Sequence, residues 1–258
     1  MDRNLRKLIA FPCEGETLLG SLDEADGATG LLIVSGGNEP RMGAHRGMAL
    51  LAARVAAAGW PVFRFDRRGV GDSGGENRGW ASSAPDLAAA VAAFRAAAPH
   101  VARLVGFGNC DAATVLALFG GELDGLALAN PWVVEPKHDL PPPAAIRARY
   151  AERLRSPGAW WRLASGGVDL RKLVRGVRAI AAPTAEPVLA RRFATALRGR
   201  KATVVLAAGD ATAIAYLDAV KAIGIAAPVH RIDTASHSFA REGDGKRLFE
   251  VIAGVLRG

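Results

Sequence analysis

The chain has 258 residues, of which 50% are hydrophobic and 22% are charged, and its formal net charge is +8. This length suits a single α/β domain with an insertion, and this composition supplies a large core and excludes a disordered chain. No apolar run reaches the roughly 20 residues of a membrane span, and the first residues lack the apolar stretch of a signal peptide. The two cysteines form neither a disulfide framework nor a zinc spacing, so we expect a cytoplasmic protein with free thiols.

The positive charge comes mostly from arginines scattered through alanine-rich segments, without a basic tract or interleaved aromatic residues. This distribution is typical of a solvated surface, and we expect no nucleic-acid partner, because that interpretation would rest on charge alone. The alternative is a basic mouth that attracts an acidic substrate.

From the first residues onward the chain alternates between strand and helix patterns. Residues 5–25 predict an antiparallel hairpin with its turn at Glu14–Gly15. Further strands are predicted at 30–37, 60–66, 102–108, 124–132, 202–210 and 227–233, and helices at 48–59, 85–98, from 111 onward, 212–223 and 245–257. This order predicts an α/β fold with a mostly parallel central sheet covered by helices on both faces.

The alternation stops between residues 133 and 199, where helical, arginine-rich pieces occur without a clear strand. An insertion between two sheet strands is best interpreted as a cap over the edge where the strands end. We therefore expect a core formed by residues 1–132 and 200–258 and a helical cap at 133–199.

The stretch LVGFGNCDAATVLALFG, residues 104–120, predicts a strand, a sharp turn and a helix, with Cys110 at the turn. A nucleophile on such a turn needs small residues two positions before and after it, and these are Gly108 and Ala112. The helix that begins at Asp111 directs its N-terminal dipole at the sulfur and favours a thiolate. The alternative is that Cys110 is a small hydrophobic residue under a helix.

Two further residues follow later strands and complete a nucleophile–acid–histidine order along the chain. Asp210 stands at the end of the stretch 202–210, and His237 follows the last strand. This is the chain order of α/β-hydrolases, in which Cys110 would attack, His237 would transfer protons and Asp210 would orient the imidazole. Asp210 could instead only cap the next helix, and Asp233 is a rival acid.

Main-chain N–H groups would hold the developing oxyanion. The candidates are the N–H of Asp111 and one N–H in the loop after the strand at 30–37, from Gly37 or Asn38. The Asp111 carboxylate would disfavour a thiolate beside it, so the direction of this side chain decides its effect.

The same loop carries Arg41, His45 and Arg46, which we expect either to bind an anionic part of the substrate or to be solvated. Asp66 and Asp72 are expected to brace the site. Cys13 is expected to be structural, and His100, His138 and His230 have no supporting context. Trp160 and Trp161 would either line a pocket or pack the cap onto the core. No metal or organic cofactor is expected, because the histidines lack ligand spacing and the glycine-rich loops lack phosphate-binding patterns.

Several motifs together resemble a known family. VFRFDRRGVGDSGG is similar to a turn common in α/β-hydrolases, and GGNEPRMGAHRG, GNCDAA, LANPWV, RYAERLRSP and AGDATA, in this order, resemble the type-one hydrolases associated with the exosortase A system. The resemblance covers residues 15–240 and implies a bacterial α/β-hydrolase encoded near exopolysaccharide and protein-sorting genes. It also places Cys110, Asp210 and His237 on the family's triad. The GNEP segment and the Pro- and Gly-rich cap depart from the family pattern and imply a different pocket.

The sequence therefore predicts a hydrolase of a carboxylic ester or thioester that forms an acyl-Cys110 intermediate, acts on a small acyl substrate and is a monomer or homodimer. Two alternatives stay open. One is an acyltransferase that uses the same site, because a thioester intermediate also reacts with nucleophiles other than water. The other is a non-catalytic binding protein on the same fold.

Overall fold

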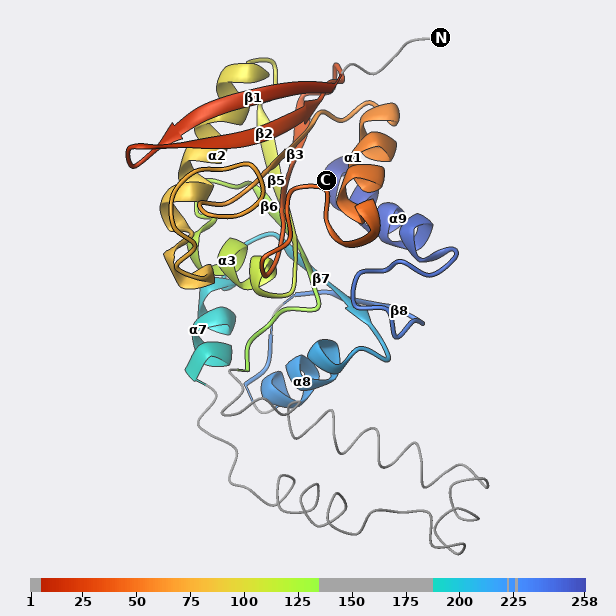
Figure 1. Ribbon diagram of the computed structural model, residues 1–258. Helices are drawn as coiled ribbons and strands as arrows, with labels where there is room; N and C mark the ends of the chain where they lie inside the picture. Colours follow the sequence, from red (N-terminus) through yellow and green to blue (C-terminus); the bar gives the residue numbers. More distant parts are fainter. Residues whose placement is uncertain (1–5, 135–187, 222, 226) are drawn as a thin grey trace, which may run out of the picture.

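The computed structural model describes residues 6–134, 188–221, 223–225 and 227–258. These residues form an eight-stranded sheet with the order β1-β2-β4-β3-β5-β6-β7-β8 (Figure 1). The strands are β1 (Arg6–Cys13), β2 (Glu16–Asp23), β3 (Thr29–Val34), β4 (Val62–Phe65), β5 (Arg103–Asn109), β6 (Gly125–Ala129), β7 (Ala202–Ala207) and β8 (Val229–Ile232). β1 pairs antiparallel with β2 and β2 with β4, whereas β4, β3, β5, β6, β7 and β8 run parallel. The predicted mostly parallel sheet is confirmed.

Local sequence explains the two kinds of strand. The β1–β2 hairpin turns at Glu14 and Gly15, which both have positive φ values of 46° and 85°, as a tight hairpin turn requires. The central strands β4, β5 and β6 are almost wholly buried and are covered on both faces, so their sequences are mostly apolar; the buried Arg64 of β4 is an exception.

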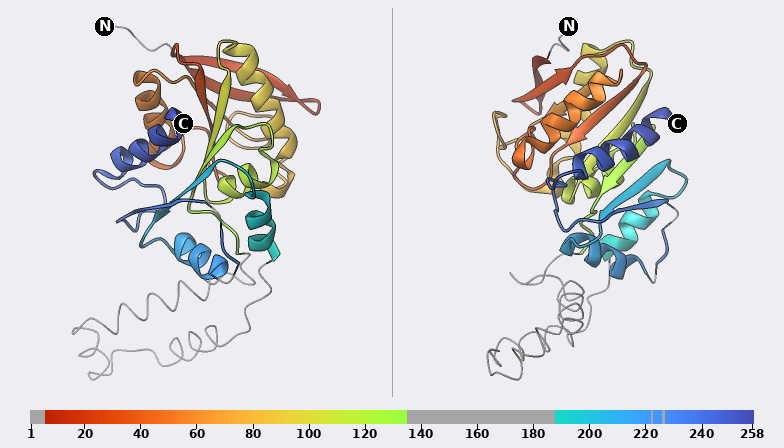
Figure 2. Two further views of the ribbon diagram at one scale, coloured as in Figure 1. Left: turned by 180° about the vertical axis from the view of Figure 1, so that it is seen from behind. Right: turned by 90° about the vertical axis from the view of Figure 1, so that its right-hand side faces the viewer.

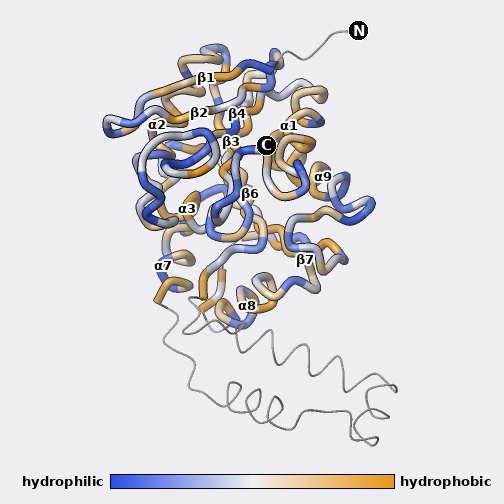
Figure 3. Tube along the Cα trace, in the orientation of Figure 1, coloured by the Kyte–Doolittle hydropathy of each residue, from blue (hydrophilic) through white to orange (hydrophobic). Residues whose placement is uncertain are grey.

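The helices form two layers, one on each face of the sheet, as the left view in Figure 2 shows. The longer helices are α1 (Gly47–Ala57), α2 (Ala84–Ala97), α3 (Asp111–Phe119), α7 (Val188–Ala196), α8 (Ala211–Val220) and α9 (Asp244–Arg257), and η1 (Ala44–Arg46) and η2 (Trp80–Ser82) are short 3₁₀ turns. Apolar residues of α1 and α9 form one core with the sheet, and those of α2, α3, α7 and α8 form the other. Hydrophobic and hydrophilic colours alternate along α9, as expected for a helix with one buried face (Figure 3).

Most of the expected cap at 133–199 lies outside the described residues. Its last part forms α7, which lies beside α3 and α8 and places Phe193 in the core. Residues 188–196 thus belong to the helical layer of the sheet. None of the helices in the described part of the chain is long and apolar enough to cross a membrane.

The topology brings four loops to one edge of the sheet. Cys110, Asn130 and Asp210 follow β5, β6 and β7, and His237 lies in the loop after β8. Because parallel strands end at the same edge, residues separated by up to 127 positions meet there, and this is where α/β sheets place their sites.

Candidate active site

Cys110 stands at a strained turn between β5 and α3. Its φ and ψ are 63° and −127°, a conformation that costs a non-glycine residue about 1–3 kcal/mol. Neighbouring hydrogen bonds hold the turn: the Cys110 N–H donates to the Ala129 carbonyl at 3.0 Å, and the Cys110 carbonyl accepts the Trp132 N–H at 3.2 Å. Cys110 itself is half-buried. The geometry is that of a nucleophile elbow.

Small residues let the chain pass close to this elbow. A Cβ at Gly108 would lie 2.8 Å from the Ala112 carbonyl carbon. A Cβ at Gly36 would lie 2.5 Å from the Asn109 carbonyl oxygen and 3.4 Å from the Cys110 Cβ. The loop after β3 therefore lies directly against the elbow.

Asp210 both caps α8 and contacts His237. Its Oδ2 accepts the N–H groups of Thr212 and Ala213, each at 3.1 Å, and lies 3.0 Å from His237 Nδ1. The sequence left open whether Asp210 contacts His237 or caps the next helix, and its carboxylate does both. The same Oδ2 atom therefore caps α8 and contacts the imidazole of His237.

His237 connects Asp210 with Cys110. Hydrogen bonds to Asp210 and to Cys110, together with the negative charge of these partners, raise the pKa of His237 to about 10 against the opposing effect of burial. An imidazolium beside a thiol favours the thiolate. The structure therefore brings Cys110, His237 and Asp210 together in an arrangement suited to nucleophilic catalysis.

Two buried asparagines, which the sequence analysis did not single out, hold the loop of His237. The side-chain amides of Asn109 and Asn130 donate to the His237 carbonyl at 3.0 and 3.1 Å. Asn130 also donates to the Asn109 side chain at 3.0 Å and accepts the Ala207 N–H at 2.8 Å. An asparagine at the end of each of two adjacent apolar strands is the signal that could have identified them, because buried polar residues are uncommon and are hydrogen-bonded.

The Asp111 side chain turns toward the loop after β3. Its Oδ1 accepts the Gly37 N–H at 2.6 Å, and its Oδ2 lies 3.7 Å from the Arg67 guanidinium. Arg67 also donates to the Gly37 carbonyl. The positive charge of Arg67 therefore offsets the carboxylate beside Cys110, and the sequence analysis had not considered this arginine.

The candidate oxyanion donors differ in their present partners. The Gly37 N–H is engaged by Asp111. Within the described part of the chain, the Asn38 N–H has no acceptor. The Asp111 N–H belongs to the first turn of α3, where N–H groups have no acceptor in the helix. Asn38 and Asp111 are thus the candidates with N–H groups available to a ligand.

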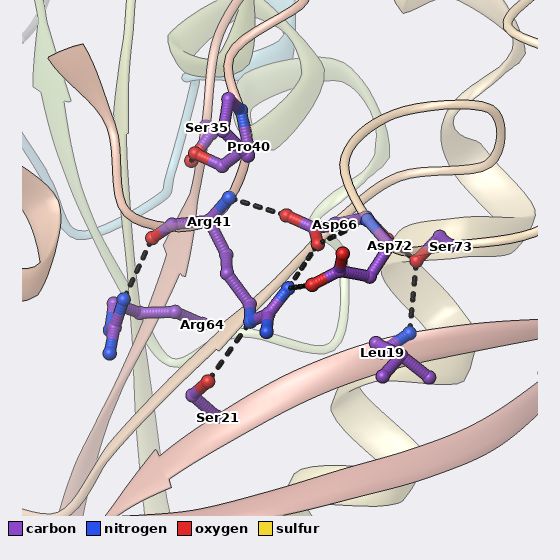
Figure 4. A network of polar contacts seen from close by, with 9 residues as sticks. All are labelled: Leu19, Ser21, Ser35, Pro40, Arg41, Arg64, Asp66, Asp72 and Ser73. Atoms are coloured by element: carbon purple, nitrogen blue, oxygen red, sulfur yellow. Dashed lines mark hydrogen bonds and ion pairs between the residues drawn. The ribbon is translucent and has the colours of Figure 1, made fainter.

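Arg41 is enclosed in a network of polar contacts (Figure 4). Its guanidinium pairs with Asp66, lies 2.9 Å from Asp72 and donates to Ser21 at 3.0 Å. Its main-chain N–H donates to Asp66 as well. Two carboxylates neutralise this arginine, so we assign it to bracing the loops and do not include it in the proposed binding residues.

His45 and Arg46 lie in η1 and are exposed, with positive φ values of 53° and 59°. A Cβ at the next residue, Gly47, would lie 3.9 Å from the Ser238 carbonyl oxygen. η1 therefore borders the loop that carries His237.

The remaining candidates either have surroundings of their own or lie outside the described residues. Cys13 is buried with its sulfur 3.5 Å from Asp86, and burial and this carboxylate raise the pKa of its thiol to about 11. Asp233 and His230 are exposed, and His100 contacts the Ala25 carbonyl at 3.0 Å. His138, Trp160 and Trp161 lie outside the described residues. Among the described residues, no three His, Cys, Asp or Glu side chains are grouped as a metal site.

Comparison with known proteins identifies the fold. No protein-family model and no curated protein matches the chain. An esterase of Pyrococcus furiosus, Pf2001, is 15% identical with a TM-score of 0.65, over 98% of this chain and 93% of the esterase. The α/β hydrolase GrgF from a Penicillium species is 17% identical with a TM-score of 0.68, over 98% of each chain. The thioesterase domain from the curacin biosynthetic pathway is 12% identical with a TM-score of 0.57, over 97% of this chain and 100% of the domain. The chain has the α/β-hydrolase fold.

Proposed function

We propose that this protein hydrolyses a carboxylic ester or thioester through an acyl-Cys110 intermediate. The observation that carries the proposal is the elbow of Cys110 facing His237, which is itself bonded to Asp210. The fold is consistent with this class, because its structural neighbours include an esterase and a thioesterase domain. The motifs shared with type-one exosortase A-associated hydrolases support a role for this chemistry in bacterial exopolysaccharide or protein-sorting pathways.

In the first half of the reaction, the Cys110 thiolate attacks the acyl carbon and forms a C–S bond while the carbonyl electrons move to the oxygen. The N–H groups of Asp111 and Asn38 hold this oxyanion. When the carbonyl re-forms, the bond to the leaving oxygen or sulfur breaks. The leaving group takes the proton of His237 Nε2, because Nδ1 faces Asp210.

In the second half, the neutral His237 takes a proton from water as the water oxygen attacks the thioester carbon. Collapse of this second oxyanion breaks the C–S bond, releases the acid and restores the thiolate beside an imidazolium. Asp210 stabilises the imidazolium, and it holds the neutral imidazole in the Nδ1–H tautomer, which leaves Nε2 free to take the proton of water. An alcohol in place of water would give acyl transfer with the same proton transfers.

The test is the pH dependence of thiol alkylation, followed by substrate assays. Iodoacetamide should modify Cys110 at neutral pH faster than it modifies a free thiol, and His237→Ala should abolish this advantage. Cys13→Ala removes the second thiol as background, and Cys13 should react little because burial and Asp86 raise its pKa to about 11. Para-nitrophenyl esters and acyl thioesters should then be hydrolysed by the wild type and not by Cys110→Ala.

Three results would change the conclusion. A Cys110 that is inert, or indifferent to His237→Ala, would favour the non-catalytic binding protein. Faster transfer of the acyl group to an added alcohol than to water would favour an acyltransferase. Hydrolysis that survives Cys110→Ala would contradict the proposed nucleophile.

A further inference from the structure

We infer that Arg67 is a positioning residue of the oxyanion hole, which holds the Gly37–Asn38 peptide by its carbonyl and so directs the Asn38 N–H at the acyl oxygen. This inference rests on the proposed function, because it concerns the stabilisation of the oxyanion in that reaction.

The guanidinium of Arg67 is fixed at several points. Arg67 comes two residues after β4, and its side chain is only 6% exposed. It donates to the Gly37 carbonyl and, at 3.1 Å, to the Ser83 hydroxyl, and it lies 3.7 Å from Asp111 Oδ2. A planar, charged guanidinium with these contacts is held in one position and orientation.

Peptide geometry transmits this support to the Asn38 N–H. The Gly37 carbonyl and the Asn38 N–H belong to one peptide unit, and no peptide bond of the described residues is cis. In a planar trans peptide the C=O and N–H bonds point in opposite directions. Because Arg67 is buried and Gly37 and Asn38 are exposed, the carbonyl points inward and the N–H points outward. A cation on the carbonyl also polarises the amide and strengthens its N–H as a donor.

The neighbouring contacts hold the same loop from other sides. The Gly37 N–H donates to Asp111 at 2.6 Å, so the peptide unit before Gly37 is tied to the elbow itself. The Asn38 side chain accepts the Asn77 amide at 2.7 Å. Gly37 has a φ of 56°, which glycine adopts without cost. Arg67 and Asp111 thus hold the carbonyl and the N–H of one glycine, and their charges offset each other beside Cys110.

The test separates stabilisation of the oxyanion from the reactivity of the thiolate. Arg67→Met keeps the volume and removes the donors, and Arg67→Lys restores the charge with one donor group. Alkylation by iodoacetamide forms no oxyanion, whereas an aldehyde analogue of the acyl group forms a hemithioacetal whose oxygen occupies the oxyanion hole.

We expect Arg67→Met to lower kcat for a para-nitrophenyl ester about 10- to 100-fold, somewhat less than the loss of a whole oxyanion donor. KM and the high-pH plateau of the alkylation rate should change less than about threefold, and the aldehyde should bind more weakly in proportion to kcat.

Arg68→Met is the matched control, because Arg68 lies in the same loop but contacts Asp86 and Glu14. It should lower stability without the selective loss of kcat and aldehyde binding. Arg67→Lys should recover part of both, and it carries the test if Arg67→Met does not fold.

An unchanged kcat in Arg67→Met, an equal loss in Arg68→Met, or a parallel fall of the alkylation plateau would overturn this inference while the proposed function stands. A wild type without ester or thioester hydrolysis would overturn both.

Discussion

At the scale of the residue, Asp210 raises the pH at which His237 loses its proton. The hydrogen bond to Asp210 is the largest of the causes that raise the pKa of His237 to about 10. A raised pKa keeps the imidazolium available as a proton donor through neutral pH, and the donor is lost as the pH rises through 10. We expect Asp210→Asn to move the alkaline fall of kcat/KM toward the ordinary histidine pKa of about 6.5. The loss in kcat should be about 10³- to 10⁴-fold, measured from the pH profile of ester hydrolysis.

This substitution spares the fold, because asparagine also caps helices and α8 can keep its first turn. Asp233→Asn is the control, since Asp233 follows β8 as His237 does but is exposed. Its pH profile should equal that of the wild type. An alkaline limb that stays in place in Asp210→Asn would show that Asp210 does not set the pKa of His237.

At the scale of the element, the crossing of β5 and α3 leaves no room for a methyl group. A Cβ at Gly108 would lie 2.8 Å from the Ala112 carbonyl carbon and 2.9 Å from Leu116 Cδ1. We expect Gly108→Ala to push the helix from the strand, to lower the free energy of unfolding by about 1–3 kcal/mol and to displace Cys110. Urea unfolding and ester hydrolysis measure the two effects.

Gly121→Ala is the matched control just beyond the other end of α3, because a Cβ there meets nothing within 4 Å. Its stability should change by no more than about 1 kcal/mol, in either direction, and its activity should be unchanged. Equal stability losses in the two variants would refute the role of close packing at Gly108.

The elements themselves were predictable because their signals are local. The signals for the turn at Glu14–Gly15, for the apolar runs of the central strands and for the end of the helix predicted at 48–59 each lie within a few residues. The elbow of Cys110 was predictable for the same reason. The sequence analysis also placed Asp210 and His237 at strand ends, and the parallel topology brought them together.

The contacts between loops were not predictable, because they join residues far apart in the chain. The sequence offered Arg41 as a candidate for substrate binding, but folding places Asp66 and Asp72 against it. Arg67 and Asn130 gave no local signal of their partners, Gly37 and His237. Their positions depend on loop conformations that the hydrophobic pattern does not encode.

At the scale of the whole molecule, cationic side chains gather at the edge of the sheet opposite Cys110. Arg103, Arg200, Lys201 and Arg231 line a groove of about 790 Å³ there. Two of these have structural partners: Arg200 donates to the Ala117 and Gly120 carbonyls near the end of α3, and Arg103 donates to the end of α9. Part of the net charge of +8 therefore serves to bind the ends of helices, where carbonyls lack partners in the helix.

Arg103 joins the start of β5 to the last turn of the chain's final helix. It donates to the Leu256 carbonyl at 2.8 Å and to the Val255 carbonyl at 3.0 Å, across 153 and 152 positions of sequence. α9 covers one face of the sheet with Leu248, Ile252 and Leu256, so its attachment completes that core. We expect Arg103→Met to lower the free energy of unfolding by about 1.5–3 kcal/mol, the range for hydrogen bonds to a charged group.

The loss should appear first in α9, because the substitution leaves its last carbonyls without donors while the strands keep their hydrogen bonds. Hydrogen exchange should therefore accelerate in α9 more than in β5, and ester hydrolysis should be unchanged because Cys110 lies at the other edge of the sheet. Arg95→Met is the control, since Arg95 is exposed on α2 and should alter stability by less than about 0.5 kcal/mol. Uniform acceleration of exchange in β5 and α9 would mean that the helix and the sheet open only together, and Arg103 would then act on the stability of the whole fold and not on a separable C-terminal helix.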